Sequence, residues 1–197
     1  MTVDSYGQDL EGNLRDLADR VHGGRYRPLP VRRTYIPKAD GGQRPLGILA
    51  LEDKIVQGAV AEVLSAIYEA DFLDCSFGFR PRRGAHQALR VVREAITTEP
   101  VNWVLDADIR RYFDNIDHEL LLRAVRKHVT CKWALLYIER WLTAPMDKDG
   151  IIIERTRGTP QGGVISPILS NLFLHYTFDL WMGRTHPVIF PQKSRQG

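Results

Sequence analysis

NWVLDADIRRYFDNIDH, residues 102–118, is the stretch of sequence that decides the fold. Its first part, Asn102–Ile109, has strand-like content, and the strand would place Val104, Asp106 and Asp108 on one face. Carboxylates that leave a strand end can bind Mg²⁺, a hard ion that prefers oxygen ligands. An aspartate at such a position is more often a helix cap or an ion-pair partner, so this motif alone leaves both interpretations open.

The second part of this stretch predicts a turn followed by a helix. Asp114 and Asp117 come after the strand, where aspartates commonly shape a turn or cap the next helix. We expect Asp117 to cap a helix that runs through Val129, with Leu121 and Val125 on its buried side. Neither aspartate is expected to be a metal ligand.

Hydrophobic periodicity and turn residues predict the elements on either side, and together they indicate an α/β (α+β) chain. Strands are expected over residues 31–36, 44–49 and 151–153, the first two joined into a hairpin by a turn at 40–42. Helices are expected over residues 8–21, 51–69, 85–96, 133–142 and 166–182. Ser166 followed by Pro167 is a favourable N-cap and first-turn pair for the last of these helices.

Residues 158–163, GTPQGG, form a glycine-bearing loop just before that helix. Glycines let backbone N–H groups approach an anion, so the composition resembles that of a phosphate cradle. It is not a Walker loop, because no GK(S/T) follows and no long parallel strand precedes it. A plain turn between a strand and a helix explains the glycines almost as well.

The charge of the chain is unevenly spread, although the net charge is only +3 over 197 residues. The segment from Arg20 to Arg44 contains seven lysines and arginines and a single acid, Asp40. A second basic run, from Arg80 to Arg93, contains no acid. Two basic runs on a nearly neutral chain indicate contact with a nucleic acid backbone or a triphosphate. A solvated surface is the equally simple alternative.

Composition excludes several other classes of protein. No stretch approaches the roughly 18 apolar residues of a membrane span, and the polar start lacks a signal peptide's apolar region, so we expect a cytoplasmic protein. Cys75 and Cys131 lie far apart, without CxxC or histidine spacing, which argues against a disulfide framework and a zinc site. We expect both cysteines to be reduced and buried.

Taken in order, five blocks of the sequence resemble group II intron-encoded reverse transcriptases along nearly the whole chain. The blocks are PVRRTYIPKADGGQRPLGIL (30–49), LEDKIVQGAVAEVL (51–64), EADFLDCSFGFRPRRGAHQAL (69–89), LDADIRRYFDNIDHELL (105–121) and RGTPQGGVISPILSNLFLH (157–175). Any one fragment would prove little, but chance agreement of all five in this order is negligible.

The resemblance implies the fingers and part of the palm of a right-hand polymerase that copies RNA into DNA. The expected division is fingers over residues 1–100, a partial palm over 101–190 and a loose tail over 191–197. The implied cofactor is Mg²⁺, bound as a pair of ions. One ion lowers the barrier to attack by the 3′ hydroxyl of the primer, and the other stabilises the leaving pyrophosphate. The implied partners are an RNA template or intron RNA, a DNA primer and deoxynucleoside triphosphates, with no membrane.

The same resemblance assigns roles to individual residues. Asp108 is implied as the catalytic aspartate and metal ligand, with the backbone carbonyl of Ile109 as an extra ligand. Lys38 and Arg44 would grip the incoming triphosphate, Phe113 would pack under the sugar, and Gln161 would line the nucleotide pocket. Contacts to template or RNA backbone are implied for Arg32, Arg33, Arg80, Arg82 and Arg83.

The sequence departs from the family pattern near its end. In the family a strand beginning near Val188 leads to a YADD-type turn with further catalytic aspartates, whereas here Phe190 is followed by PQKSRQG. We therefore expect a chain truncated at both ends, with an incomplete metal site and no polymerase activity alone. The alternatives are a non-catalytic RNA-binding maturase remnant that assists intron RNA folding, and an inert remnant that does not fold stably.

Overall fold

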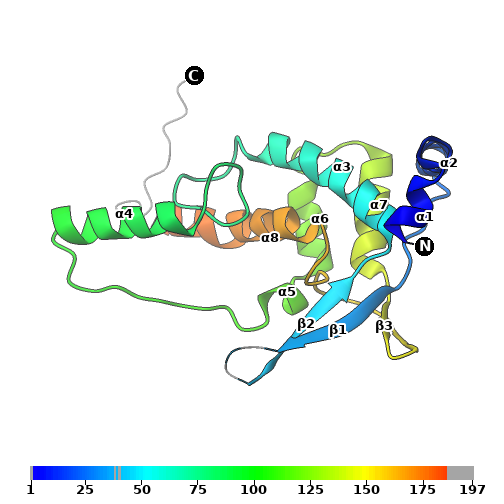
Figure 1. Ribbon diagram of the computed structural model, residues 1–197. Helices are drawn as coiled ribbons and strands as arrows, with labels where there is room; N and C mark the ends of the chain where they lie inside the picture. The colour runs from blue at the N-terminus through cyan, green and yellow to red at the C-terminus, as the bar shows by residue number, and fades with distance from the viewer. Residues whose placement is uncertain (1, 38, 40, 186–197) are drawn as a thin grey trace.

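The computed structural model describes residues 2–37, 39 and 41–185 (Figure 1). Its elements are α1 (Val3–Gly7), α2 (Leu10–His22), β1 (Val31–Pro37), β2 (Gln43–Ile48), α3 (Leu51–Tyr68), α4 (Ala85–Thr98), α5 (Tyr112–Asn115), α6 (His118–Val125), α7 (Lys132–Thr143), β3 (Met146–Lys148), β4 (Ile151–Ile153), α8 (Ser166–Leu174), the π-helical turn η1 (His175–Asp179) and α9 (Leu180–Thr185). The predicted α/β class is confirmed.

The described strands form one sheet in the order β2-β1-β3-β4. β1 and β2 pair antiparallel with Arg33 opposite Gly47, as expected of the hairpin. β3 was not foreseen as a strand: it pairs in parallel with β1 through Val31 and Met146, and antiparallel with β4. The sheet therefore joins segments that lie far apart in the sequence.

A helical core lies beside this sheet and holds most of the buried side chains. α3, α6, α7 and α8 pack together through residues such as Leu64, Leu121, Val125, Ile138 and Leu169. Where α7 leads into β3, the backbone N–H of Val31 at the start of β1 donates to the carbonyl of Pro145 at 2.8 Å. Figure 1 shows the sheet projecting from one end of these helices.

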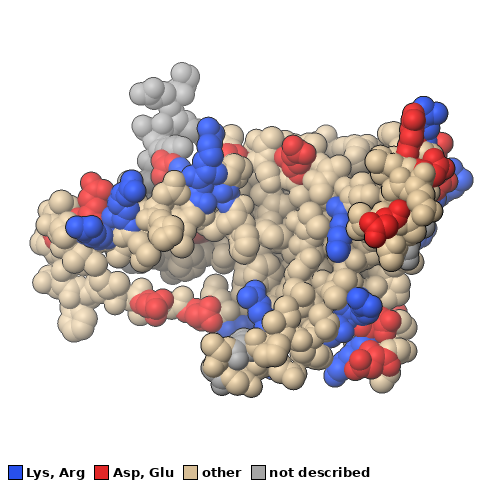
Figure 2. All heavy atoms as spheres, in the orientation of Figure 1, with Lys and Arg blue, Asp and Glu red and all other residues tan. Residues whose placement is uncertain are grey.

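The strand predicted for Asn102–Ile109 is wrong. These residues form an irregular, exposed segment that returns from α4 to α5, with Trp103 92% and Leu105 90% exposed. A strand is held by hydrogen bonds to a neighbouring strand, and none of the described strands runs beside this one. Asp106 and Asp108 therefore do not share a strand face, and Figure 2 shows open space between this segment and the rest of the molecule.

α4 forms where the periodicity predicted it, yet none of its residues is buried. Its apolar side chains Leu89, Val92 and Ile96 are exposed. We refer to α4 together with the returning residues 99–109 as the arm. In Figure 1 α4 lies at the end of the molecule away from the sheet, and the chain that follows it runs back to α5 beside the sheet.

Several local expectations differ from the structure. Ile165, and not Ser166, occupies the N-cap position of α8, and the helix expected through Met182 is interrupted by η1. Val63 and Ile67 of α3 are exposed, because the core covers only the face that carries Val56, Val60 and Leu64. Cys75 and Cys131 are unpaired as expected, but both are exposed and not buried.

Among the described residues, no helix is long and apolar enough to span a membrane.

Candidate nucleotide site

The GTPQGG loop is fixed at its first glycine to the segment that carries α5. The backbone N–H of Gly158 donates to the carbonyl of Ile116 at 2.7 Å, and that of Thr159 donates to Phe113 at 2.7 Å. Gly158 has a φ of +79°, and a Cβ there would lie 2.7 Å from the carbonyl oxygens of Phe113 and Asp114. Only glycine permits this close approach of two backbones.

The other end of the loop is fixed to the β1–β2 hairpin. The N–H of Gly47 donates to the carbonyl of Gln161 at 2.5 Å. Gly162 has a φ of +100°, and a Cβ there would lie 2.7 Å from the carbonyl oxygen of Gly47. The loop therefore holds β2 and α5 at a fixed separation, which is the position in which both can contribute side chains to one site.

A cavity of about 920 Å³ opens beside this junction. It is lined by six of the site residues singled out in the sequence, namely Arg33, Arg44, Asp108, Ile109, Phe113 and Gln161. Arg44 comes from β2, Asp108 from the end of the arm, Phe113 from α5 and Gln161 from the loop. The structure thus brings these four residues together. Lys38, the other residue expected here, lies outside the described residues.

A second hollow of about 620 Å³ adjoins the first, because Arg44, Phe113 and Gln161 line both. Its remaining wall includes Phe79 and the start of α8. Ser166 lies there with its hydroxyl oxygen buried and without a hydrogen-bond partner among the described residues. The three shared residues therefore form a partition between two hollows.

Sequence reasoning missed several residues of the first cavity, chiefly because β3 was not expected as a strand. Met146 and Lys148 of β3 line the cavity beside Arg33 and Tyr35 of β1. The Lys148 ammonium lies 6.0 Å from the centre of the Tyr35 ring, within the range of a cation–π contact. The signal available in the sequence was the alternation of Met146 and Lys148 about Asp147, which the turn residues that follow obscured.

The acidic groups of the site are few. Asp108 and Asp114 line the cavity, and the carbonyl of Ile109 accepts the backbone N–H of Tyr112 at 3.2 Å. Among the described residues, no group of three or more histidine, cysteine or carboxylate side chains is placed to hold a metal ion. Two ions in close proximity need several convergent oxygen ligands, so these residues alone do not fit a two-ion site.

The arginines expected to touch nucleic acid have different surroundings. Arg80 is only 6% exposed, and its guanidinium donates to both oxygens of Glu69 and to the carbonyls of Leu73 and Ser76. A guanidinium surrounded in this way ties the chain together and is not open to a phosphate, so the structure does not favour the expected RNA contact at this residue.

The neighbouring arginines are more accessible. Arg83 pairs with Asp74 at 2.7 Å, while Arg82 is exposed and holds a φ of +58°, a conformation that costs free energy in a residue other than glycine. Arg32 is exposed on β1, and Arg33 is half-buried with its Nε 2.7 Å from the sulfur of Met146.

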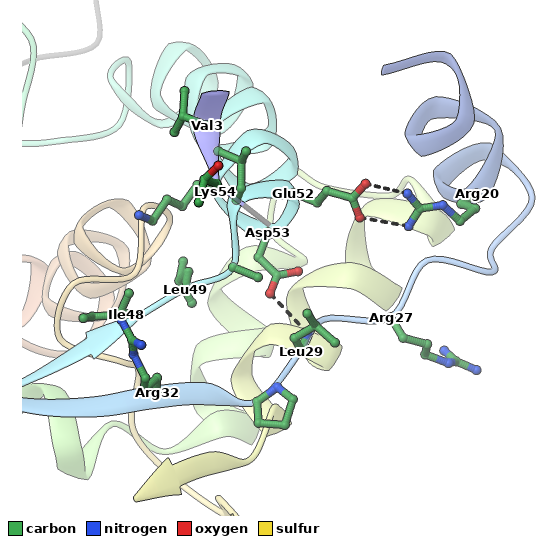
Figure 3. A pocket seen from close by; sticks show the side chains of 14 residues that line it. Val3, Arg20, Arg27, Leu29, Arg32, Ile48, Leu49, Glu52, Asp53 and Lys54 are labelled. Atoms are coloured by element: carbon green, nitrogen blue, oxygen red, sulfur yellow. Dashed lines mark hydrogen bonds and ion pairs between the residues drawn. The ribbon is translucent and has the colours of Figure 1, made fainter. Parts of the chain in front are cut away.

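A cavity of about 610 Å³ lies elsewhere, between α1, α2, the hairpin and the start of α3 (Figure 3). Here Arg20 pairs with Glu52 at 2.7 Å, and the buried Asp53 accepts hydrogen bonds from the Tyr26 hydroxyl and the Leu29 N–H. Burial raises the pKa of Asp53, and the Tyr26 and Leu29 hydrogen bonds oppose that rise.

The cations around this cavity do not converge on one point. Arg20 is occupied by Glu52, while Arg27 and Lys54 extend in opposite directions in Figure 3. A site for an anion would need several cations aimed at the same place. We therefore interpret this cavity as a packed junction between the N-terminal helices and α3.

Residues 36–191, more than half of the chain, match the family described as Reverse transcriptase (RNA-dependent DNA polymerase). The chain belongs to this family. It is 41% identical over 176 residues to Protein YkfC of Escherichia coli (strain K12), an alignment that covers 88% of this chain and 46% of that protein. It is 35% identical over 175 residues to the Group II intron-encoded protein LtrA of Lactococcus lactis subsp. cremoris, covering 88% of this chain and 28% of LtrA.

A third relative is the 91 kDa protein in the cob intron of Schizosaccharomyces pombe, 35% identical over 170 residues, with 84% of this chain and 21% of that protein covered. This chain spans less than half of the length of each of these relatives. The predicted membership in the group II intron type of reverse transcriptase is confirmed by this set of relatives. The matched region includes β2, α5, β3 and the GTPQGG loop, whereas Arg33 and Tyr35 of β1, which also line the cavity, precede it.

Proposed function

We propose that this chain provides the nucleotide-binding and template-binding part of an enzyme that synthesises DNA on an RNA template. The reverse transcriptase domain itself is established by the family and its intron-encoded relatives, which do not favour the maturase remnant over this function. The observation that supports the site is the convergence of Arg44, Asp108, Phe113 and Gln161 on one cavity.

Each of these residues has a role that its chemistry suits. The Arg44 guanidinium binds the triphosphate of the incoming deoxynucleotide through paired hydrogen bonds. Phe113 packs beneath the sugar, where an added 2′ hydroxyl would collide with the ring. Gln161 lines the same pocket from the loop, whose backbone is fixed on both sides. Lys38 is proposed as a second triphosphate ligand, and its position lies outside the described residues.

Reverse transcriptases are in general nucleotidyltransferases that depend on metal ions. We propose that Asp108 supplies one carboxylate and Ile109 its backbone carbonyl to a Mg²⁺ ion. The described residues do not complete a site for two ions, so the described part of the chain alone would not catalyse phosphoryl transfer.

RNA and a DNA primer are the proposed nucleic-acid partners. Arg32, Arg33, Arg82 and Arg83 are the proposed contacts to backbone phosphates, whereas Arg80 holds the 69–80 segment together from within. In Figure 2 the basic side chains of the visible face are dispersed and adjoin acidic ones. This mixed surface favours weak binding without sequence preference.

We also propose that residues 1–100 correspond to the fingers and 101–190 to part of the palm, with 191–197 as a tail. The sheet crosses that boundary, because β3 pairs with β1 of the hairpin and β4 pairs with β3. Residues 186–197 lie outside the described residues.

Nucleotide binding tests the site directly. We expect Arg44→Ala to lower the affinity for a deoxynucleoside triphosphate by about tenfold or more, because a charged hydrogen bond contributes about 1.5–3 kcal/mol. Arg123→Ala is the matched control, since Arg123 is an exposed arginine of α6 that does not line the cavity. Equal affinity in all three proteins would count against the proposed triphosphate site.

Primer extension tests the metal site. We expect the purified 197-residue chain, supplied with Mg²⁺, an RNA template, a DNA primer and four deoxynucleotides, to give no extension. Asp108→Ala should behave identically. Mg²⁺-dependent synthesis that disappears in Asp108→Ala would mean that the chain assembles a working metal site, and the proposal of incomplete catalysis would be withdrawn.

RNA titration at two salt concentrations tests the basic surface. Each phosphate contact to a single strand contributes about 0.7 to the slope of log affinity against log salt concentration. We expect Arg32→Ala and Arg82→Ala each to reduce the slope, and Arg15→Ala to leave it unchanged, because Arg15 pairs with Glu11 outside both basic runs. Affinity that is insensitive to salt would contradict a phosphate-contact surface.

A further inference from the structure

One arginine near the nucleotide site has a buried nitrogen without a hydrogen-bond partner in the part of the chain that the structure describes. Arg155 lies between β4 and the GTPQGG loop, and its Nη1 atom is buried without a hydrogen-bond partner among the described residues. A buried donor left unpaired costs about 1–3 kcal/mol, and more when it carries charge. Such groups are few in folded proteins, and a bound water, ion or ligand that pairs with the group is one explanation of them.

The surroundings of Arg155 add to this cost. Burial, together with the nearby guanidinium of Arg33, lowers the pKa of Arg155 to about 10, and the charge of Asp114 opposes both effects. Among the described residues, neither arginine has a carboxylate within ion-pair distance, so Asp114 is close without pairing with either. Two cations therefore face one acid in a partly buried place.

Two of these three groups lie at the wall of the cavity. Arg33 and Asp114 both line it, and so does Ile153, two residues before Arg155. Arg33 stands on the sheet face opposite the one that carries Arg44, because the strand register alternates the two faces across the hairpin. The two arginines thus define a place in the cavity separate from the proposed triphosphate contact of Arg44.

We propose that Arg155 and Arg33 form a phosphate-binding subsite at the edge of this cavity, with Arg33 in its wall and Arg155 next to it. A phosphate oxygen between them would pair the buried Nη1, offset the repulsion of two like charges and use the forked geometry that guanidinium groups offer to phosphates. The phosphate belongs either to a polyphosphate chain or to a nucleic-acid backbone. The subsite extends the proposed function to a second anionic group at the same cavity, and it rests on that function for the identity of the ligand.

Thermal unfolding separates this role from a structural one. Inorganic tripolyphosphate and a single-stranded RNA with a 5′ hydroxyl are the two probes, and a probe that binds only the folded chain raises its Tm. We expect at least one of the two probes to raise the Tm of the wild type. The same probe should not raise the Tm of Arg155→Met. Without any probe, Arg155→Met should melt about 2–4 °C higher than wild type, because an unpaired buried charge has been removed.

Two further variants show whether a change in Tm is specific to the proposed subsite. Arg157→Met removes an exposed arginine from the same segment and should match the wild type with and without probe. Arg33→Met should lose the same probe-dependent gain as Arg155→Met. If only the tripolyphosphate gain is lost the subsite takes a polyphosphate, and if only the RNA gain is lost it takes a backbone phosphate.

The proposal is overturned if Arg155→Met melts lower than the wild type, or does not fold, while Arg33→Met keeps the full gain, since Arg155 would then be a structural residue. It is also overturned if neither probe stabilises the wild type. The experiment needs no catalysis, and it compares Arg155→Met and Arg33→Met with a wild type that keeps Arg44. Its failure is therefore distinct from a failure of the proposed nucleotide site, which the Arg44→Ala titration measures.

Discussion

The helical core and the arm carry similar apolar residues, but these side chains are buried in the core and exposed in the arm. Leu169 of α8 is fully buried in the core, whereas Leu105 of the arm is 90% exposed. Within the arm, α4 still forms, because a helix makes its hydrogen bonds within its own segment. Residues 102–109, for which the sequence predicts a strand, do not form one, because a strand makes its backbone hydrogen bonds with a neighbouring strand. Local pattern therefore suffices for a helix and not for a strand.

Matched leucine substitutions test this contrast most strongly. We expect Leu169→Ala to lower the free energy of unfolding by about 2–5 kcal/mol, because it leaves a cavity in the core. Leu105→Ala should change it by less than about 0.5 kcal/mol. Urea denaturation measures both. A large cost at Leu105 would mean that the arm is packed against the protein in solution.

A glycine pair provides the next test. We expect Gly158→Ala to cost about 1–3 kcal/mol, since its positive φ and the carbonyls 2.7 Å from a Cβ leave no room for the methyl group. Gly84→Ala, at the start of α4, meets nothing within 4 Å and should be close to neutral. Urea denaturation again compares the two, and equal costs would show that the loop is not held between β2 and α5.

His175 allows a test by pH. Burial lowers the pKa of His175 below its ordinary 6.5. The charge of Asp71 opposes this effect, and that of Arg80 adds to it. Asp179 lies 3.9 Å from the Nδ1 of His175. The unfolded chain then binds more protons below pH 6.5, so the stability that this residue contributes is present above pH 6.5 and falls as the pH decreases.

The slope from one such group is at most about 1.4 kcal/mol per pH unit. We expect His175→Gln to flatten the pH dependence of urea denaturation below pH 6.5. His86→Gln, on the exposed α4, should leave that slope as it is in the wild type. An unchanged slope in His175→Gln would mean that this histidine does not titrate differently on folding.

The smallest effect on stability is expected at Trp103, in the returning part of the arm. Trp103→Ser should change the free energy of unfolding by less than about 0.5 kcal/mol, because the side chain is 92% exposed. Limited digestion with chymotrypsin should nevertheless cut wild type first within residues 99–109 and cut the variant there more slowly. First cleavage within α7 or α8 would contradict the exposure of the arm.

The elements that the sequence predicted well are those whose signals are local. The hairpin followed from strand-like residues on both sides of a glycine turn, and the α6 cap from Asp117, whose carboxylate accepts the N–H of Leu120 at 2.9 Å. β3 was missed because its pairing with Val31 is not visible from its own residues. The strand over 102–109 was predicted from alternation alone, which contains no information on whether a partner strand is present.

For the site, the resemblance selected residues that the structure brings together, but it could not show what surrounds each one. Arg80 and Arg82 are two positions apart in the same motif, yet one is enclosed by Glu69 and backbone carbonyls and the other is exposed. Arg155 carried no signal in the sequence, since the lack of a partner is a property of three-dimensional packing.

The parallel pairing of β1 with β3 has a consequence for how the chain is made. During synthesis the β1–β2 hairpin leaves the ribosome long before β3 exists, so its β1 edge must wait unpaired while α3 through α7 are added. An uncovered strand edge can pair with another chain in that interval. The β1 edge therefore stays open to such pairing until Met146 and the rest of β3 have been synthesised.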